Sequence, residues 1–121
     1  LVDDNESIRM MVKSILELKN EIFETIREAE NGLEAMELSK KQNADLILMD
    51  LSMPVMDGFE ATKLIMKDAP STKIIALTIQ MTEMNIEAIK KAGAVGYLEK
   101  NSSPNEFFTK INEVFGTIEG L

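Results

Sequence analysis

Short apolar runs and helix-like repeats alternate along this chain. The runs at 46–49 and 74–77 are apolar at every position, which is typical of strands buried on both faces of a parallel sheet. A largely apolar run at 95–98 predicts another short strand. Residues 23–28 instead alternate between charged and apolar side chains, which predicts a half-exposed edge strand.

The segments between and around these runs have the spacing of amphipathic helices. The predicted inward residues are Ile8, Met11, Val12, Ile15 and Leu16 in the first helix, Ala61, Leu64 and Ile65 in the third, and Phe107, Phe108, Ile111, Val114, Phe115 and Ile118 in the last. The predicted N-caps are Asp4 or Asn5, Asn31, Asp57, Thr82 and Ser103. Lys90 and Lys91, followed closely by Gly93, predict the end of the fourth helix.

Strands that alternate with helices predict an α/β fold with a parallel sheet and right-handed crossovers. We expect a flavodoxin-like, doubly wound (βα)5 three-layer sandwich, with a five-stranded sheet in the order 2-1-3-4-5. Leu1 and Val2 are too few for a central strand, so the first strand is expected to be truncated at the N-terminus. Residues 1–121 show no linker and are interpreted as a single domain.

Composition removes several kinds of chemistry. The net charge is −8, which argues against direct nucleic-acid binding by this chain. No apolar run approaches the ~20 residues of a membrane span, and the absence of Cys makes the cytoplasm the default location. Without His, nucleophilic and metal chemistry must come from carboxylates, hydroxyls and lysines.

Acidic residues follow two of the predicted strands. Asp3 and Asp4 end the first strand, and Asp50 follows the apolar run at 46–49. The predicted strand order places both ends at the switch point of the sheet, where ligands bind in such folds. Three carboxylates repel one another unless a cation joins them, and Mg²⁺ prefers such oxygen ligands.

Two further polar residues are expected at the same edge. Thr78 ends the fourth strand and Lys100 closes the fifth, so they can supply a hydroxyl donor and a mobile positive charge to a phosphoryl group. With a metal bound, Asp50 can act as a nucleophile on phosphorus, since aspartyl phosphates are a known class of covalent intermediate.

These residues carry a resemblance to a known family. The matching motifs are the acidic pair at 3–4, D-x-x-M-P-x-M-D-G at 50–58, Thr78, G-Y-L-x-K at 96–100 and S-P-x-E at 103–106. In this order and at these spacings, the chain resembles the response-regulator receiver domain of two-component signalling, over essentially its whole length. The resemblance implies a signalling domain that catalyses its own phosphorylation and dephosphorylation, and not a turnover enzyme.

The resemblance also implies roles for individual residues. Asp50 resembles the phosphoacceptor, which takes its phosphoryl group from a sensor histidine kinase or a phosphotransfer protein. Asp3, Asp4 and the backbone carbonyl of Ser52 are similar to the other groups that hold Mg²⁺ around it. Lys100 resembles the lysine that pairs with the phosphoryl group.

Thr78 and Tyr97 resemble the switch pair of the family, in which the hydroxyl moves onto the phosphoryl group and the aromatic ring turns inward. The output surface is then the face of the fourth helix, the fifth strand and the fifth helix. The S-P-x-E motif is similar to receivers joined to a helix-turn-helix DNA-binding domain. It leaves open whether the output domain is fused or separate, and whether the domain forms a homodimer.

The chain departs from the family pattern at several positions. Ile79 is bulky where a small residue is common, and we expect it to restrict access to the phosphoryl group. Asn101 replaces a common proline, and a cis bond before a non-proline residue costs about 2.5–4 kcal/mol, which leaves the geometry of the 100–101 peptide open. Ser52 and Gln80 occupy positions that tune phosphoryl lifetime in the family.

Three other functions compete with a phosphorylation switch. An aspartate-nucleophile phosphohydrolase usually has a second Asp two residues after the nucleophile, where this chain has Ser52. A flavin carrier needs a phosphate-cradling first loop, whereas the acidic residues at 3–6 would repel a phosphate. An unphosphorylated interaction module with the same fold stays open because of Ile79 and Asn101.

Overall fold

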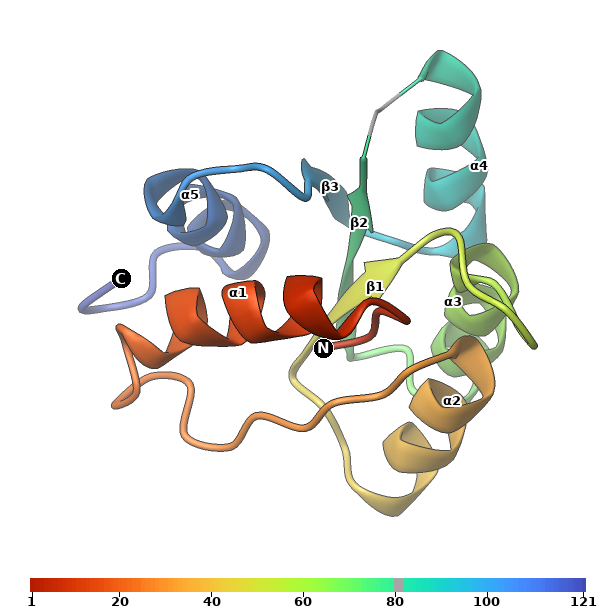
Figure 1. Cartoon of the computed structure of the whole chain (residues 1–121), viewed down its shortest axis with the longest axis horizontal. Coiled ribbons are helices and arrows are strands. Elements are labelled where there is room, and N and C mark those ends of the chain that lie inside the picture. Colours follow the sequence, from red (N-terminus) through yellow and green to blue (C-terminus); the bar gives the residue numbers. More distant parts are fainter. Residues whose placement is uncertain (80–81) are drawn as a thin grey trace.

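Three parallel strands lie at the centre of the molecule in the computed structural model, which describes residues 1–79 and 82–121 (Figure 1). The strands are β1 (Leu46–Asp50), β2 (Lys73–Thr78) and β3 (Gly96–Glu99). The helices of the described residues are α1 (Glu6–Glu17), α2 (Gly32–Lys41), α3 (Gly58–Asp68), α4 (Glu83–Ala92) and α5 (Pro104–Phe115). None of these helices has the length and apolar character needed to cross a membrane.

The sheet has the order β1-β2-β3, and two single bridges extend it beyond β1. Leu48 pairs with Ile75, and Leu77 pairs with Leu98. Val2 bridges to Met49 on one side and to Ala29 on the other, both in parallel. The segments therefore follow the predicted order 2-1-3-4-5, although the first two contribute bridges and not full strands.

The predicted edge strand at 23–28 is wrong, because these described residues form no strand. A strand forms where a neighbour exchanges backbone hydrogen bonds with it. Here residues 1–3 pair with the chain just beyond this segment, at Ala29, whose N–H donates to Leu1 O and whose oxygen accepts from Asp3 N. An alternating pattern does not by itself specify which backbone pairs with it.

Helices cover both faces of the sheet and produce the predicted three layers (Figure 1). On one face α2, α3 and α4 pack over a cluster that includes Ile47 and Met49. On the other, α1 and α5 pack over a cluster that includes Leu48 and Phe107. Successive residues of β1 thus enter opposite layers, as expected for a strand buried on both faces.

Side-chain caps begin the helices at the predicted positions. The side chains of Asn5, Asn31, Asp57, Thr82 and Ser103 each accept a hydrogen bond from the backbone N–H three residues further on. At Ser103 the capping box is complete, because Glu106 also accepts from the Ser103 N–H. Gly93 ends α4 with φ of 114°, a left-handed conformation that glycine adopts without strain.

Some predicted inward residues lie elsewhere. Met11 and Phe115 are exposed, at the margins of the stripes of α1 and α5, and Leu64 is only half-buried. Ile118 lies beyond the end of α5, but it packs against the α1 and α5 side of the core. Helical periodicity predicts the side of the helix from which a side chain projects. Whether a side chain at the border of the apolar face is buried depends on which neighbouring element covers it.

Candidate functional site

Three carboxylates meet at the carboxyl edge of the sheet. Asp50 is the last residue of β1 and is 2% exposed, and Asp3 follows the Val2 bridge and is fully buried. Asp4 is exposed beside them. One carboxylate oxygen from each of the three lies within 4.8 Å of the others. The predicted convergence of the N-terminal acids with the mid-chain acid is therefore present.

Lys100 lies between the two buried acids. Its Nζ is 2.8 Å from Asp3 Oδ2 and 3.0 Å from Asp50 Oδ1, and its side chain is 12% exposed. Its backbone N–H donates to Thr78 O at 2.7 Å, which holds the residue after β3 against the end of β2. One ammonium thus partly neutralises two carboxylates in a poorly hydrated site.

The loop after β1 fits closely around Asp50. The Ser52 N–H donates to Asp50 Oδ1 at 3.3 Å, which orients the carboxylate. A Cβ on Gly58 would lie 2.0 Å from Asp50 O, so this close approach requires glycine. Val55 has φ of 68° at the exposed tip of the loop, a conformation that is strained for a β-branched residue.

Burial and charge shift two proton equilibria in the site. Burial, together with the charge of Asp3, raises the pKa of Asp50 to about 6, although Lys100 and the Ser52 N–H act to lower it. For Lys100, burial lowers the pKa, but the hydrogen bonds to Asp3 and Asp50 and the negative charges of these carboxylates together outweigh it, so the net pKa is raised. The lysine therefore stays charged at neutral pH.

The site suits a hard divalent cation. Asp50 Oδ2 is buried and has no hydrogen-bond partner among the described residues, so it is an oxygen in need of a ligand. Oxygen-only donors from Asp3, Asp4 and Asp50 are the set that Mg²⁺ takes, with water filling the remaining positions. A cation would also offset the repulsion between the acids.

The residues predicted for the switch lie on β2 and β3. Thr78 is buried at the end of β2. Tyr97, on β3, is half-buried against the cluster under α3 and α4, and Lys110 Nζ lies 5.7 Å from the centre of its ring. The Ile79 side chain is 82% exposed, and its predicted effect on access stays a prediction.

Two further positions, Asn101 and Gln80, stand out in the sequence by comparison with the family pattern. The Lys100–Asn101 peptide is trans, as are the other described peptide bonds. Gln80, predicted to tune phosphoryl lifetime, lies outside the described residues.

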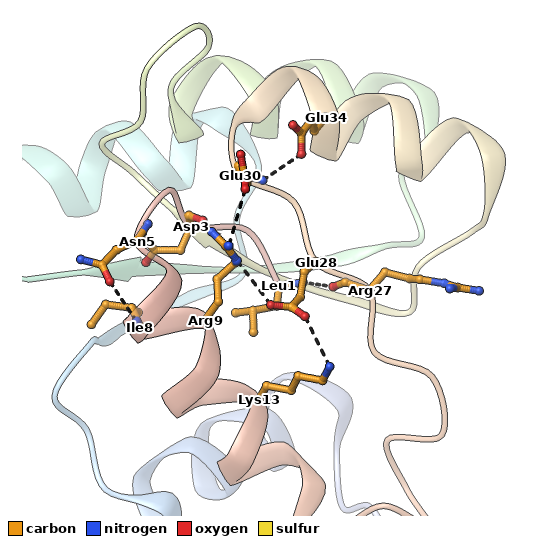
Figure 2. Close-up of polar contacts among 10 residues, drawn as sticks. All are labelled: Leu1, Asp3, Asn5, Ile8, Arg9, Lys13, Arg27, Glu28, Glu30 and Glu34. Atoms are coloured by element: carbon orange, nitrogen blue, oxygen red, sulfur yellow. Dashed lines mark hydrogen bonds and ion pairs between the residues drawn. The ribbon is translucent and has the colours of Figure 1, made fainter.

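The sequence patterns missed one buried charged residue, Arg9. It lies on the inward side of α1 and is 8% exposed. Figure 2 shows its guanidinium beside the loop that carries the acidic pair, with Glu28 and Glu30 around it. An arginine next to Ile8 in the apolar stripe of the first helix was the available indication.

The chain thus combines a doubly wound α/β fold with three acids and a lysine at the carboxyl ends of its central strands. The chain belongs to the response regulator receiver domain family, whose model matches residues 1–112. Members of this family are signalling modules of two-component systems.

Individual relatives support this assignment. The chemotaxis protein CheY of Halobacterium salinarum is 40% identical over 94% of this chain and 92% of its own length. The transcriptional regulatory protein DegU of Brevibacillus brevis is 36% identical over 94% of this chain, which spans about half (48%) of DegU. The solved structure of Vibrio cholerae CheY4 has a TM-score of 0.84 with 32% identity, over 93% of each chain.

Proposed function

We propose that this chain is a phosphorylation-dependent receiver in which Asp50 accepts a phosphoryl group from a sensor histidine kinase or a phosphotransfer protein. The observation that carries the proposal is the buried, unpartnered Oδ2 of Asp50 beside a second buried acid and a buried lysine. A carboxylate in these surroundings is poorly solvated and well oriented, which favours it as a nucleophile.

In the proposed reaction, an Asp50 oxygen forms a bond to phosphorus while the bond from phosphorus to the donor's nitrogen breaks. The donor keeps that electron pair and takes up a proton. Asp3, Asp4, Asp50 and the Ser52 carbonyl would hold Mg²⁺, which supplies charge neutralisation at the phosphoryl oxygens. Lys100 is already 3.0 Å from Asp50 Oδ1, close enough to pair with a phosphoryl oxygen once one is attached.

The proposed response is a shift between two populations. Thr78 turns its hydroxyl to the phosphoryl group, and Tyr97 moves further into the space between β3 and α4. The altered surface is formed by α4, β3 and α5. The half-burial of Tyr97 supports this proposal, because part of its side chain is still exposed and can become buried.

The proposal is tested by incubating the protein with Mg²⁺ and acetyl phosphate and measuring its mass. We expect a gain of one phosphoryl group, no gain without Mg²⁺, and none in Asp50→Asn. An equal gain in Asp50→Asn would contradict the assignment, and no gain in the wild type would favour the unphosphorylated interaction module. Steady hydrolysis of a phosphomonoester would instead indicate a phosphohydrolase.

The setting of the domain is also proposed. Residues 1–121 form a single receiver domain in a cytoplasmic two-component pathway. Similarity to DegU and to the transcriptional regulatory protein LiaR supports an output by DNA binding through another domain, whereas similarity to CheY supports a receiver that acts alone. Homodimer formation is compatible with either.

A further inference from the structure

Arg9 contacts the backbone between the two N-terminal acids. Its Nη1 donates to the carbonyl oxygen of Asp3 at 2.6 Å, in a buried hydrogen bond. Its Nε donates to Glu28 Oε1 at 3.3 Å, and its Nη2 is 3.7 Å from Glu30 Oε1 (Figure 2). The guanidinium thus joins α1, the acidic loop and the edge segment.

This contact fixes the plane of one particular peptide. The carbonyl of Asp3 belongs to the Asp3–Asp4 peptide bond, which is planar, so holding its oxygen restricts the direction in which both side chains leave the backbone. The Asp3 carboxylate is restrained on its other side, because Oδ1 accepts from the Asn5 N–H at 2.9 Å and Oδ2 lies 2.8 Å from Lys100 Nζ.

We propose that Arg9 is a positioning residue for the metal site: by holding the Asp3 carbonyl it aims the carboxylates of Asp3 and Asp4 at Asp50. Glu28 and Glu30 in turn hold the guanidinium. This inference rests on the proposed function, since it assigns Arg9 to the same magnesium site. Groups outside the ligand shell commonly determine metal affinity by orienting the ligands.

The direction in which the Mg²⁺ affinity changes when Arg9 is replaced distinguishes a positioning role from an effect of its charge. Removing a positive charge near three carboxylates strengthens the attraction of a cation by Coulomb's law alone. Losing the orientation of two ligands weakens binding instead. A variant without the guanidinium therefore gives opposite results under the two explanations.

The experiment compares Arg9→Met, Arg9→Lys and Glu28→Gln with the wild type by titrating Mg²⁺ alone and following the backbone amide resonances by NMR. We expect Arg9→Met to raise the Kd for Mg²⁺ about 10-fold. Arg9→Lys, which keeps the charge but loses the forked donor, is expected to fall between Arg9→Met and the wild type.

Lys13→Met is the matched control. Lys13 lies on the same helix and pairs with Glu28 at 3.4 Å, but its ammonium lies outside the contacts of Asp3 described above. The substitution removes one positive charge that pairs with Glu28 but leaves the Asp3 carbonyl held, so under the proposal the Kd for Mg²⁺ does not rise. A thermal unfolding curve of each variant verifies that the protein is folded at the temperature of the titration.

The outcomes are distinct. An unchanged or lower Kd in Arg9→Met, or an equal rise in Lys13→Met, would overturn the positioning role. If Arg9→Met does not fold, the test uses Arg9→Lys and Glu28→Gln. A wild-type Kd for Mg²⁺ in both of these variants would overturn the positioning role of Arg9. A wild type that binds no Mg²⁺ removes the proposed function itself, whereas a wild type that binds it leaves the variants to test Arg9.

Discussion

Buried polar groups have opposite surroundings at the amino edge and the carboxyl edge of the sheet, where the parallel strands begin and end. At the amino edge Thr72 is buried, but its hydroxyl donates to Ala44 O at 2.8 Å, and the charged Asp45 beside it is exposed. At the carboxyl edge Asp3 and Asp50 are buried with one lysine between them. The amino edge is arranged for stability, whereas the carboxyl edge holds unbalanced charge that a ligand can relieve.

Removing the lysine should expose this difference most strongly. Lys100→Met leaves two buried carboxylates without their shared partner, and breaking a buried ion pair costs about 3 kcal/mol of unfolding free energy. Chemical denaturation in EDTA measures the loss, and Mg²⁺ should recover part of it. A variant as stable as the wild type in EDTA would show that the two buried carboxylates do not need the charge of Lys100 for stability.

Gly58→Ala tests how tightly the loop encloses Asp50. The added Cβ would meet Asp50 O, so the backbone must shift, and overpacking of this kind costs about 2 kcal/mol. We expect slower phosphorylation of Asp50 by acetyl phosphate together with a lower melting temperature. Wild-type behaviour would mean that the loop adapts without moving the carboxylate.

Asp50→Asn should stabilise the protein at pH 7 without metal. Burial raises the folded-state pKa of Asp50 from 3.8 to about 6, so the ionised carboxylate is disfavoured in the folded protein above that pH. The gain in unfolding free energy is about 3 kcal/mol by linkage.

The same shift gives the pH dependence its sign. The Asp50 carboxyl holds its proton more tightly in the folded protein than in the unfolded one. The loss of unfolding free energy caused by its ionisation is therefore complete above pH ~6 and disappears as the pH falls toward ~4. Denaturation curves of both proteins in EDTA, at pH 7 and pH 4, measure it. A gain that persists unchanged at pH 4 would assign the effect to something other than ionisation.

Thr72→Val is the comparison at the amino edge and should have the smallest effect. It removes a single neutral hydrogen bond to the Ala44 carbonyl, which is worth about 1 kcal/mol. The loss should be the same with and without Mg²⁺, and phosphorylation of Asp50 should be unchanged. A dependence on Mg²⁺ would show that the two edges are coupled.

Local patterns in the sequence determined the helices, their caps and the residues at the strand ends. Asn31, Asp57 and Ser103 cap helices because a cap needs only a side-chain oxygen and the backbone within three residues. The apolar runs of β1 and β2 likewise require burial on both faces. These features depend on neighbours in the chain, so the sequence is sufficient to predict them.

Tertiary structure alone decided which charges are buried and which segments pair. Arg9 is buried because Asp3, Glu28 and Glu30 surround it, and Lys100 bridges two acids that lie far from it in the sequence. Residues 23–28 form no strand, and the backbone bridge to Val2 lies just beyond them, at Ala29. Burial of a charge and formation of a strand both depend on partners remote in the chain, and periodicity does not specify those partners.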